Sequence, residues 1–197
     1  MKVLAALLLA LVGALPAHAV TLRYTTTLSG PAESPANASP GTGFATVIFD
    51  SVVHTLEVQE TFSGLSSPTT ASHIHCCVAP PGATGVATML PTFSLFPLGV
   101  TSGSLDQTFN TLLASTYNPA FVTAHGGTPD GAEAALIAGL NAGQSYLNIH
   151  TSAFPSGEIR GFLAVTPVPE PESYALMLAG LVVLGVVSRR RKGLRSV

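Results

Sequence analysis

Positive charge is scarce between the two ends of this 197-residue chain. Between residues 20 and 166 the cations are Arg23 and Arg160, and eight carboxylates outnumber them. A domain with this balance lacks the basic surface that binds the phosphates of a nucleic acid. We therefore expect no nucleic-acid partner.

Common catalytic motifs are also missing. The sequence contains no Gly-x-Ser-x-Gly nucleophile elbow, no phosphate-binding glycine loop and no His-Glu-x-x-His zinc motif. Glu57 and Glu60 fall on opposite faces of one predicted strand, so they cannot form the carboxylate pair of a glycosidase. A cysteine nucleophile would need a depressed pKa, which an acidic domain does little to favour. These absences predict a protein that is not an enzyme.

Residues 1–19 have the pattern of a secretory signal peptide. Lys2 precedes an apolar run over residues 3–15, which is too short to span a bilayer comfortably. The run is followed by Ala17-His18-Ala19, the small-residue pattern of a cleavage site. We expect cleavage after Ala19.

Residues 167–197 form a second targeting segment. Pro169-Glu170-Pro171 precedes an apolar stretch over residues 175–187, which predicts a transmembrane helix. The basic residues that would remain cytoplasmic are Arg189, Arg190, Arg191 and Lys192. This order resembles the PEP-CTERM sorting signal, which implies processing by an exosortase-type enzyme. The protein would be anchored transiently in the inner membrane and then released to the cell surface or extracellular matrix. A permanent C-terminal anchor is the alternative.

The intervening residues 20–166 suffice for one domain with one core. Alternating apolar residues and turn signals predict strands at residues 20–28, 44–50, 53–62 and 103–109, and two strands within 145–165. One helix is predicted over residues 129–143, with Asp130 as N-cap and Glu133 closing a capping box. We expect an all-β antiparallel β-sandwich, immunoglobulin-like or superoxide-dismutase-like. One short helix is inserted, and the signal peptide and C-terminal transmembrane helix flank the domain.

Three segments of this domain resemble the chordin-type (CHRD) domain. They are Leu28–Asp50, Gly64–His75 and Tyr146–Leu163, and the third is the most specific because it contains Asn-Ile-His-Thr and Gly-Glu-Ile-Arg-Gly. The resemblance implies an extracellular β-domain. Together with the sorting signals and the missing catalytic motifs, it favours a non-enzymatic structural, adhesive or binding module. Exopolysaccharide and other surface proteins are the expected partners.

The sequence His-Ile-His-Cys-Cys contains the candidate metal ligands. His73 and His75 share one face of an extended strand, and a second strand must supply the remaining ligands. His150, or alternatively Glu158, completes a set of three, and His125 on a flexible turn is a candidate fourth. Such a site suits copper or zinc. The histidine order also resembles that of copper–zinc superoxide dismutases, which implies a metalloprotein with such a site as the alternative function. The competing interpretation is that these histidines only hydrogen-bond and hold the strands in place.

Cys76 and Cys77 are adjacent and leave three alternatives open. Neighbouring Cα atoms lie about 3.8 Å apart, below the usual disulfide span of about 4.4–6.8 Å. A strained vicinal disulfide, pairing with another molecule, and metal ligation by Cys77 are all compatible with the sequence. The vicinal disulfide is favoured because it needs no partner. Glu158 and Arg160 form a further candidate pair, as an ion pair or as members of a hydrogen-bond network.

Overall fold

The computed structural model describes residues 21–167, together with residues 178, 180–182 and 184. The predicted signal peptide and most of the predicted C-terminal transmembrane helix lie outside these residues. Within the described residues, no helix is long and apolar enough to cross a membrane. The chain divides into two compact units, Met1–Thr166 and Pro167–Val197.

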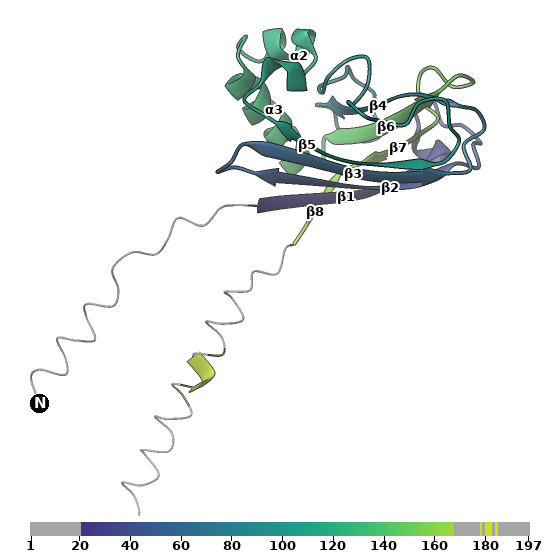
Figure 1. Ribbon diagram of the computed structural model, residues 1–197. Coiled ribbons are helices and arrows are strands. Elements are labelled where there is room, and N and C mark those ends of the chain that lie inside the picture. The colour runs from purple at the N-terminus through teal and green to yellow at the C-terminus, as the bar shows by residue number, and fades with distance from the viewer. Residues whose placement is uncertain (1–20, 168–177, 179, 183, 185–197) are drawn as a thin grey trace, which may run out of the picture. The chain divides into compact units, whose positions relative to one another are not determined.

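The first unit is built on one curled antiparallel sheet of eight strands (Figure 1). The strands are β1 (Thr21–Ser29), β2 (Thr42–Asp50), β3 (Thr55–Ser63), β4 (Thr69–Cys76), β5 (Gly103–Asn110), β6 (Ser145–Thr151), β7 (Ile159–Phe162) and β8 (Ala164–Thr166). Their order is β4-β6-β7-β1-β2-β3-β5, and β8 also pairs with β1. The sheet curls so that β4, β6 and β7 form one layer above β1, β2, β3 and β5 (Figure 1).

The helices follow β5 and lie beside one end of the sheet (Figure 1). They are η3 (Ala114–Thr116), α2 (Pro119–Ala124) and α3 (Pro129–Asn141), and a further 3-10 turn, η2 (Gly30–Ala32), follows β1. The sequence predicted α3 but not α2, whose six residues are too few to show a helical period. The N-cap of α3 is Thr128, which accepts a hydrogen bond from Gly131 N, and not Asp130 as predicted. Glu133 contacts His54 instead of closing a capping box.

The apolar core lies between the two layers of the sheet. Val47 and Leu56 from the lower layer and Ile74 and Leu147 from the upper layer are fully buried and belong to one cluster. Leu136 of α3 joins the same cluster. Side chains alternate along a strand, so the residues that flank Ile74 in β4 and Leu147 in β6 point to the opposite, outer face of this layer. That outer face contains the candidate site.

Candidate metal centre

A layer of polar and aromatic side chains covers the outer face of β4, β6 and β7. Its members are His73, His75, Tyr146, Asn148, His150, Arg160 and Phe162. In one row across the sheet His73 pairs with Asn148 and then Arg160, and in the next His75 pairs with Tyr146 and then Phe162. Loops cover this layer, so His73 and His75 expose only 5% and 7% of their surface.

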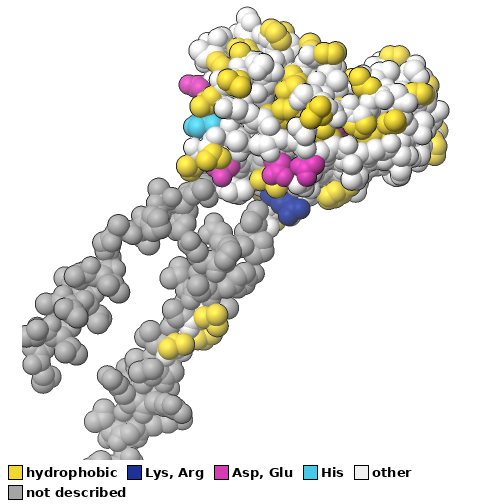
Figure 2. Space-filling model, in the orientation of Figure 1, with side chains coloured by type: hydrophobic (Ala, Val, Ile, Leu, Met, Phe, Trp, Pro, Cys, Tyr) yellow, Lys and Arg dark blue, Asp and Glu magenta, His cyan; other side chains and the backbone are white. Residues whose placement is uncertain are grey.

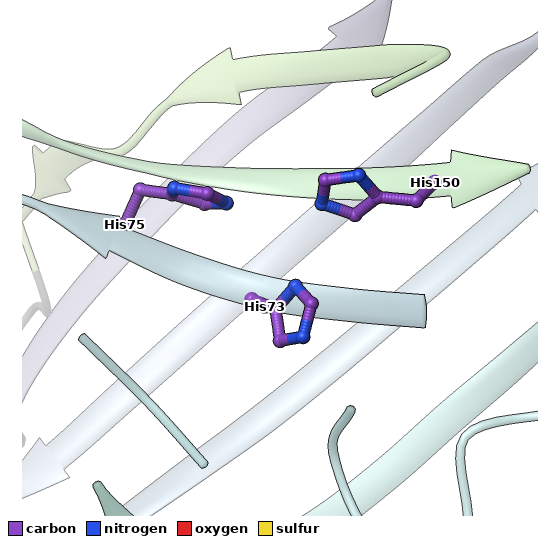
Figure 3. Close-up of side chains that lie close together, drawn as sticks. All are labelled: His73, His75 and His150. Carbon is purple, nitrogen blue, oxygen red and sulfur yellow. The ribbon is translucent and has the colours of Figure 1, made fainter. Parts of the chain in front are cut away.

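The structure brings three of the predicted ligands together. One nitrogen each from His73, His75 and His150 lies within 4.8 Å of the other two (Figure 3). His73 and His75 come from β4, and His150 comes from the adjacent strand β6. The alternation of side chains along both strands accounts for this convergence.

Each of these rings donates one hydrogen bond to a backbone carbonyl. His73 Nε2 donates to Pro91 O at 2.6 Å, and His75 Nδ1 donates to Thr84 O at 2.8 Å. His150 Nδ1 donates to Pro155 O at 2.9 Å. A carbonyl can only accept, so these nitrogens carry the protons and the opposite nitrogens carry lone pairs.

The three lone pairs have no hydrogen-bond donor. His73 Nδ1, His75 Nε2 and His150 Nε2 are buried and unpartnered. Burial lowers the pKa of His73 and His75 to about 4, partly opposed by the hydrogen bonds to the carbonyls, and it also lowers the pKa of His150. All three rings are therefore neutral at pH 7. Neutral imidazoles oriented by carbonyls through their other nitrogen are the form in which histidine ligates metal ions.

Arg160 fastens the covering loops over this layer. Its guanidinium donates to Ala32 O at 2.6 Å, Pro81 O at 2.7 Å and Gly82 O at 3.1 Å. It also lies 4.7 Å from the centre of the Tyr146 ring. The Tyr146 ring also stacks with the His75 ring, with the two ring centres 4.7 Å apart. The arginine is thus part of the support of the site.

Tyr146 connects this support to the loop that orients His75. Its hydroxyl accepts from Thr84 N at 3.1 Å and donates to Thr84 O at 3.2 Å. Thr84 O is also the acceptor for His75 Nδ1. One tyrosine therefore fixes both the ring plane of His75 and the carbonyl that sets its tautomer.

Of the two alternatives predicted for Glu158 and Arg160, the described residues show no ion pair between them, and each side chain instead joins a hydrogen-bond network. Arg160 instead lies 3.7 Å from the Glu33 carboxylate, measured from its Nε. Burial raises the pKa of Glu33 to about 7, and the positive charge of Arg160 opposes part of that rise.

Glu158 belongs to a separate network. Its carboxylate accepts hydrogen bonds of 2.6 Å from Ser39 Oγ, Ser66 N and Thr151 Oγ1. Burial alone would raise its pKa, but these hydrogen bonds outweigh burial and lower it. Glu158 is therefore engaged away from the three histidines and is absent from their cluster.

Comparison with known families identifies the domain. The sequence model of the CHRD domain matches residues 24–163. The chain belongs to the CHRD domain family. A second model, of the PEP-CTERM protein-sorting motif, matches residues 167–192. No curated protein and no solved structure matches the chain.

The PEP-CTERM motif determines where this CHRD protein resides. The motif marks a chain that is exported, processed by an exosortase-type enzyme, and anchored in the membrane transiently before it reaches the surface. The three-histidine cluster lies inside the matched CHRD segment, whereas Pro169, Glu170, Pro171 and Arg189–Arg191 lie inside the sorting motif.

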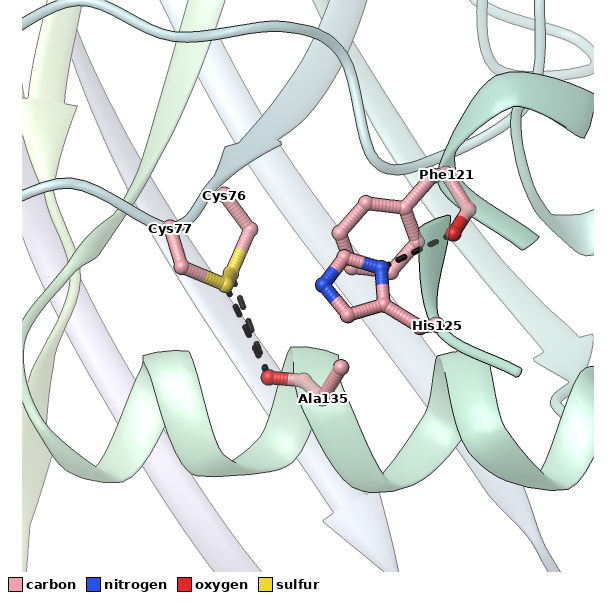
Figure 4. Close-up of a disulfide and its surroundings, with 5 residues drawn as sticks. All are labelled: Cys76, Cys77, Phe121, His125 and Ala135. Atoms are coloured by element: carbon pink, nitrogen blue, oxygen red, sulfur yellow. Dashed lines mark hydrogen bonds between the residues drawn. A yellow bond between two sulfur atoms is a disulfide. The ribbon is translucent and has the colours of Figure 1, made fainter. Parts of the chain in front are cut away.

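The two cysteines of the CHRD domain lie away from the histidine cluster. Cys76 and Cys77 are joined by a disulfide that packs on α3, where both sulfurs approach Ala135 O (Figure 4). His125 is also outside the cluster: its Nδ1 donates to Phe121 O at 2.8 Å and its ring packs on Phe121 (Figure 4). The structure thus places neither Cys77 nor His125 with His73 and His75.

Several residues of the site escaped the sequence reasoning. Tyr146 shares the alternation of His150, so its face was predictable but its contact with Thr84 was not. Glu33 lies in a loop far from Arg160 in the sequence, and no local pattern indicates their contact. The carbonyls that orient the histidines come from irregular loops, which hydrophobic periodicity does not describe.

Proposed function

We propose that this protein is a non-enzymatic surface module whose CHRD domain holds one copper or zinc ion on His73, His75 and His150. The observation that carries the proposal is that three imidazoles lie together and that each has one buried nitrogen without a hydrogen-bond partner. The other nitrogen of each ring donates to a backbone carbonyl, which leaves the lone pair of the unpartnered nitrogen available to a metal ion.

The energetics favour a metal ion over simple packing. Leaving a buried acceptor without a partner costs about 1–3 kcal/mol, and the cluster contains three such acceptors. Zinc–nitrogen bonds of about 2.0–2.1 Å in a tetrahedral site place the nitrogens about 3.4 Å apart. Ligand atoms already within 4.8 Å reach this geometry by small ring movements. Imidazole donors suit zinc and copper, and they suit calcium and magnesium poorly.

The burial of the cluster supports a structural ion over a catalytic one. Catalytic metal sites keep one position open to water or substrate. Here the covering loops, fastened by Arg160 and Tyr146, bury the unpartnered nitrogens. An ion in this place would tie β4 and β6 together beneath the loops. The stiffened face would then serve a structural or adhesive role toward exopolysaccharide or other surface proteins.

A superoxide-dismutase-like enzyme is the second candidate function. The curl of the sheet into two layers supports a β-sandwich of the immunoglobulin-like or superoxide-dismutase-like type, and copper on histidines is compatible with redox chemistry. Superoxide consumption by the copper-loaded domain separates the two candidates. The structural proposal predicts no activity above that of the metal-free domain.

The proposal is tested by elemental analysis of residues 20–166 after export to an oxidising periplasm. We expect close to one equivalent of zinc or copper in the parent domain. His150→Ala should abolish binding, whereas His125→Ala should retain it because His125 lies outside the cluster. A parent domain that takes up no metal, or equal losses in both variants, would contradict the proposal. Circular dichroism of both variants verifies that they remain folded.

A further inference from the structure

The N-terminal and C-terminal ends of the CHRD domain leave the sheet at the same end of its strands. Thr21, the first residue of β1, pairs with Asp50 at the end of β2, and Thr166, the last residue of β8, pairs with Arg23. The turn from β2 to β3 begins directly after Asp50. The chain therefore enters and leaves the domain beside this turn.

Exposed aliphatic side chains gather beside that exit. Val52 and Val53 in the β2–β3 turn expose 62% and 61% of their surface. Leu112 and Leu113, which follow β5, expose 43% and 53%. The two segments are in contact, because Thr111 N donates to His54 O at 2.9 Å. We call these four aliphatic residues the exit patch.

The backbone of the exit patch is held in place. Asp50 Oδ1 accepts from Val52 N at 2.8 Å and from Val53 N at 3.1 Å. Asn110 Oδ1 accepts from Leu112 N at 2.9 Å. The aliphatic side chains of the exit patch are thus presented to solvent by ordered loops.

The charges near the exit patch are few and are mostly engaged. Asp50 caps the turn, and the carboxylate of Glu133 is bound by His54 and Thr111. Arg23, in the row next to the chain exit, is exposed. The charged side chains that are visible on this face lie mainly toward the end from which the chain leaves the domain (Figure 2). The domain as a whole carries eight carboxylates against two arginines, so contact with a lipid surface must come from the aliphatic side chains and not from charge attraction.

We propose that the exit patch rests on the bilayer surface while the C-terminal segment anchors the chain. Eight residues separate Thr166 from the apolar stretch that begins at Ala175. Fully extended, they span at most about 29 Å, so Thr166 stays within about that distance of the apolar stretch. Tethering at such a distance gives a millimolar effective concentration, on the order at which even a small apolar contact is populated.

This contact would keep the sorting signal close to the membrane. With the exit patch on the lipid headgroups, the Pro169-Glu170-Pro171 triplet stays near the membrane surface, where a membrane-embedded processing enzyme can reach it. The partner is the lipid surface itself, and the aliphatic side chains supply the contact. Release of the tail would end the tethering and with it the contact, because four aliphatic residues alone bind a bilayer weakly.

The test is fluorescence of residues 20–197, with the C-terminal segment retained, in phosphatidylcholine–phosphatidylglycerol vesicles. An environment-sensitive dye is attached at Val53→Cys, and labelling is specific because the native cysteines are joined in a disulfide. The matched control is Leu95→Cys, which is 78% exposed and lies toward the opposite end of the sheet, beside Phe96 and its partner Phe62. Nitroxide-bearing lipids then report direct lipid contact.

We expect the dye at Val53 to shift to shorter wavelength in vesicles and to be quenched by nitroxide lipids, whereas the dye at Leu95 does neither. Quenching at neither position would overturn the proposal, and equal quenching at both would show unspecific adsorption in its place. A shifted but unquenched dye at Val53 would assign the patch to another part of the chain or to a second copy, which also overturns it.

Discussion

Replacing Glu60 by glutamine should make the domain more stable at neutral and alkaline pH. Glu60 is 1% exposed in β3, on the core-facing side of the sheet. Its Oε2 accepts from Ser72 Oγ at 2.9 Å, and its Oε1 is buried without a partner. Burial raises its pKa from 4.5 to about 8, and the hydrogen bond from Ser72 opposes only part of this rise.

The sign of the effect follows from proton binding. Between pH 4.5 and about 8 the folded domain retains the Glu60 proton while the unfolded chain has released it. The free energy of unfolding therefore falls as pH rises through this interval and is highest below it. The free energy of unfolding changes by about 1.4 kcal/mol per pH unit in this interval. Relative to its value below pH 4.5, it is lower by about 3 kcal/mol at pH 7 and by about 5 kcal/mol at pH 9. Glutamine carries no charge and avoids this loss.

The assay is urea unfolding of the metal-free domain at pH 5, 7 and 9. The difference in unfolding free energy between Glu60→Gln and the parent should grow steadily with pH. Comparing the two proteins cancels the titration of all other groups. Glu57→Gln is the matched control, since Glu57 is half-buried on the opposite face of the same strand. A Glu60→Gln difference that stays constant from pH 5 to 9 would refute the reasoning.

Three further predictions concern the histidine layer and its surroundings. Because the pKa of His73 and of His75 is lowered to about 4, their contribution to stability is complete above pH 6.5 and is lost as pH falls toward 4. The advantage in unfolding free energy of the metal-free parent over His73→Gln/His75→Gln should therefore be smaller at pH 5 than at pH 7, and this comparison cancels the opposite pH dependence of Glu33 and Glu60. An advantage that does not change between the two pH values would contradict the burial of neutral imidazoles. Arg160→Met should lower the free energy of unfolding, measured by thermal unfolding, by about 3–5 kcal/mol, because the carboxylate of Glu33 stays buried without its partner. A loss under about 1 kcal/mol would show that the arginine is dispensable. Gly139→Ala should lower the melting temperature, because a Cβ would lie 2.3 Å and 2.7 Å from the disulfide sulfurs, whereas Gly85→Ala meets nothing within 4 Å; equal effects would contradict the packing of α3.

The strands were largely predictable because their pattern is local. Alternating apolar residues such as Leu56 and Val58 mark the core face, and the structure buries both. The same alternation predicted that His73 and His75 share one face of a strand and that His150 lies on a second strand. What it could not supply was the order of strands in the sheet, and β4 lies beside β6 only through a non-local pairing.

The parts that sequence reasoning missed depend on contacts between distant segments. Arg160 lies beside Glu33, whereas Glu158 accepts hydrogen bonds from Ser39 and Ser66 in loops and from Thr151 in β6. The N-cap of α3 is Thr128 because the helix begins at Pro129, and Glu133 contacts His54 across the fold. The contacts of Arg160 with Glu33 and of Glu133 with His54 thus depend on segments that are distant in the sequence.

X-ray absorption spectroscopy of the zinc- or copper-loaded domain tests the central claim most directly. The three-histidine centre predicts a first shell of about three imidazole nitrogens near 2.0–2.1 Å, with no sulfur because both cysteines are joined in a disulfide. A first shell that contains sulfur near 2.3 Å, or oxygen ligands alone, would contradict the account.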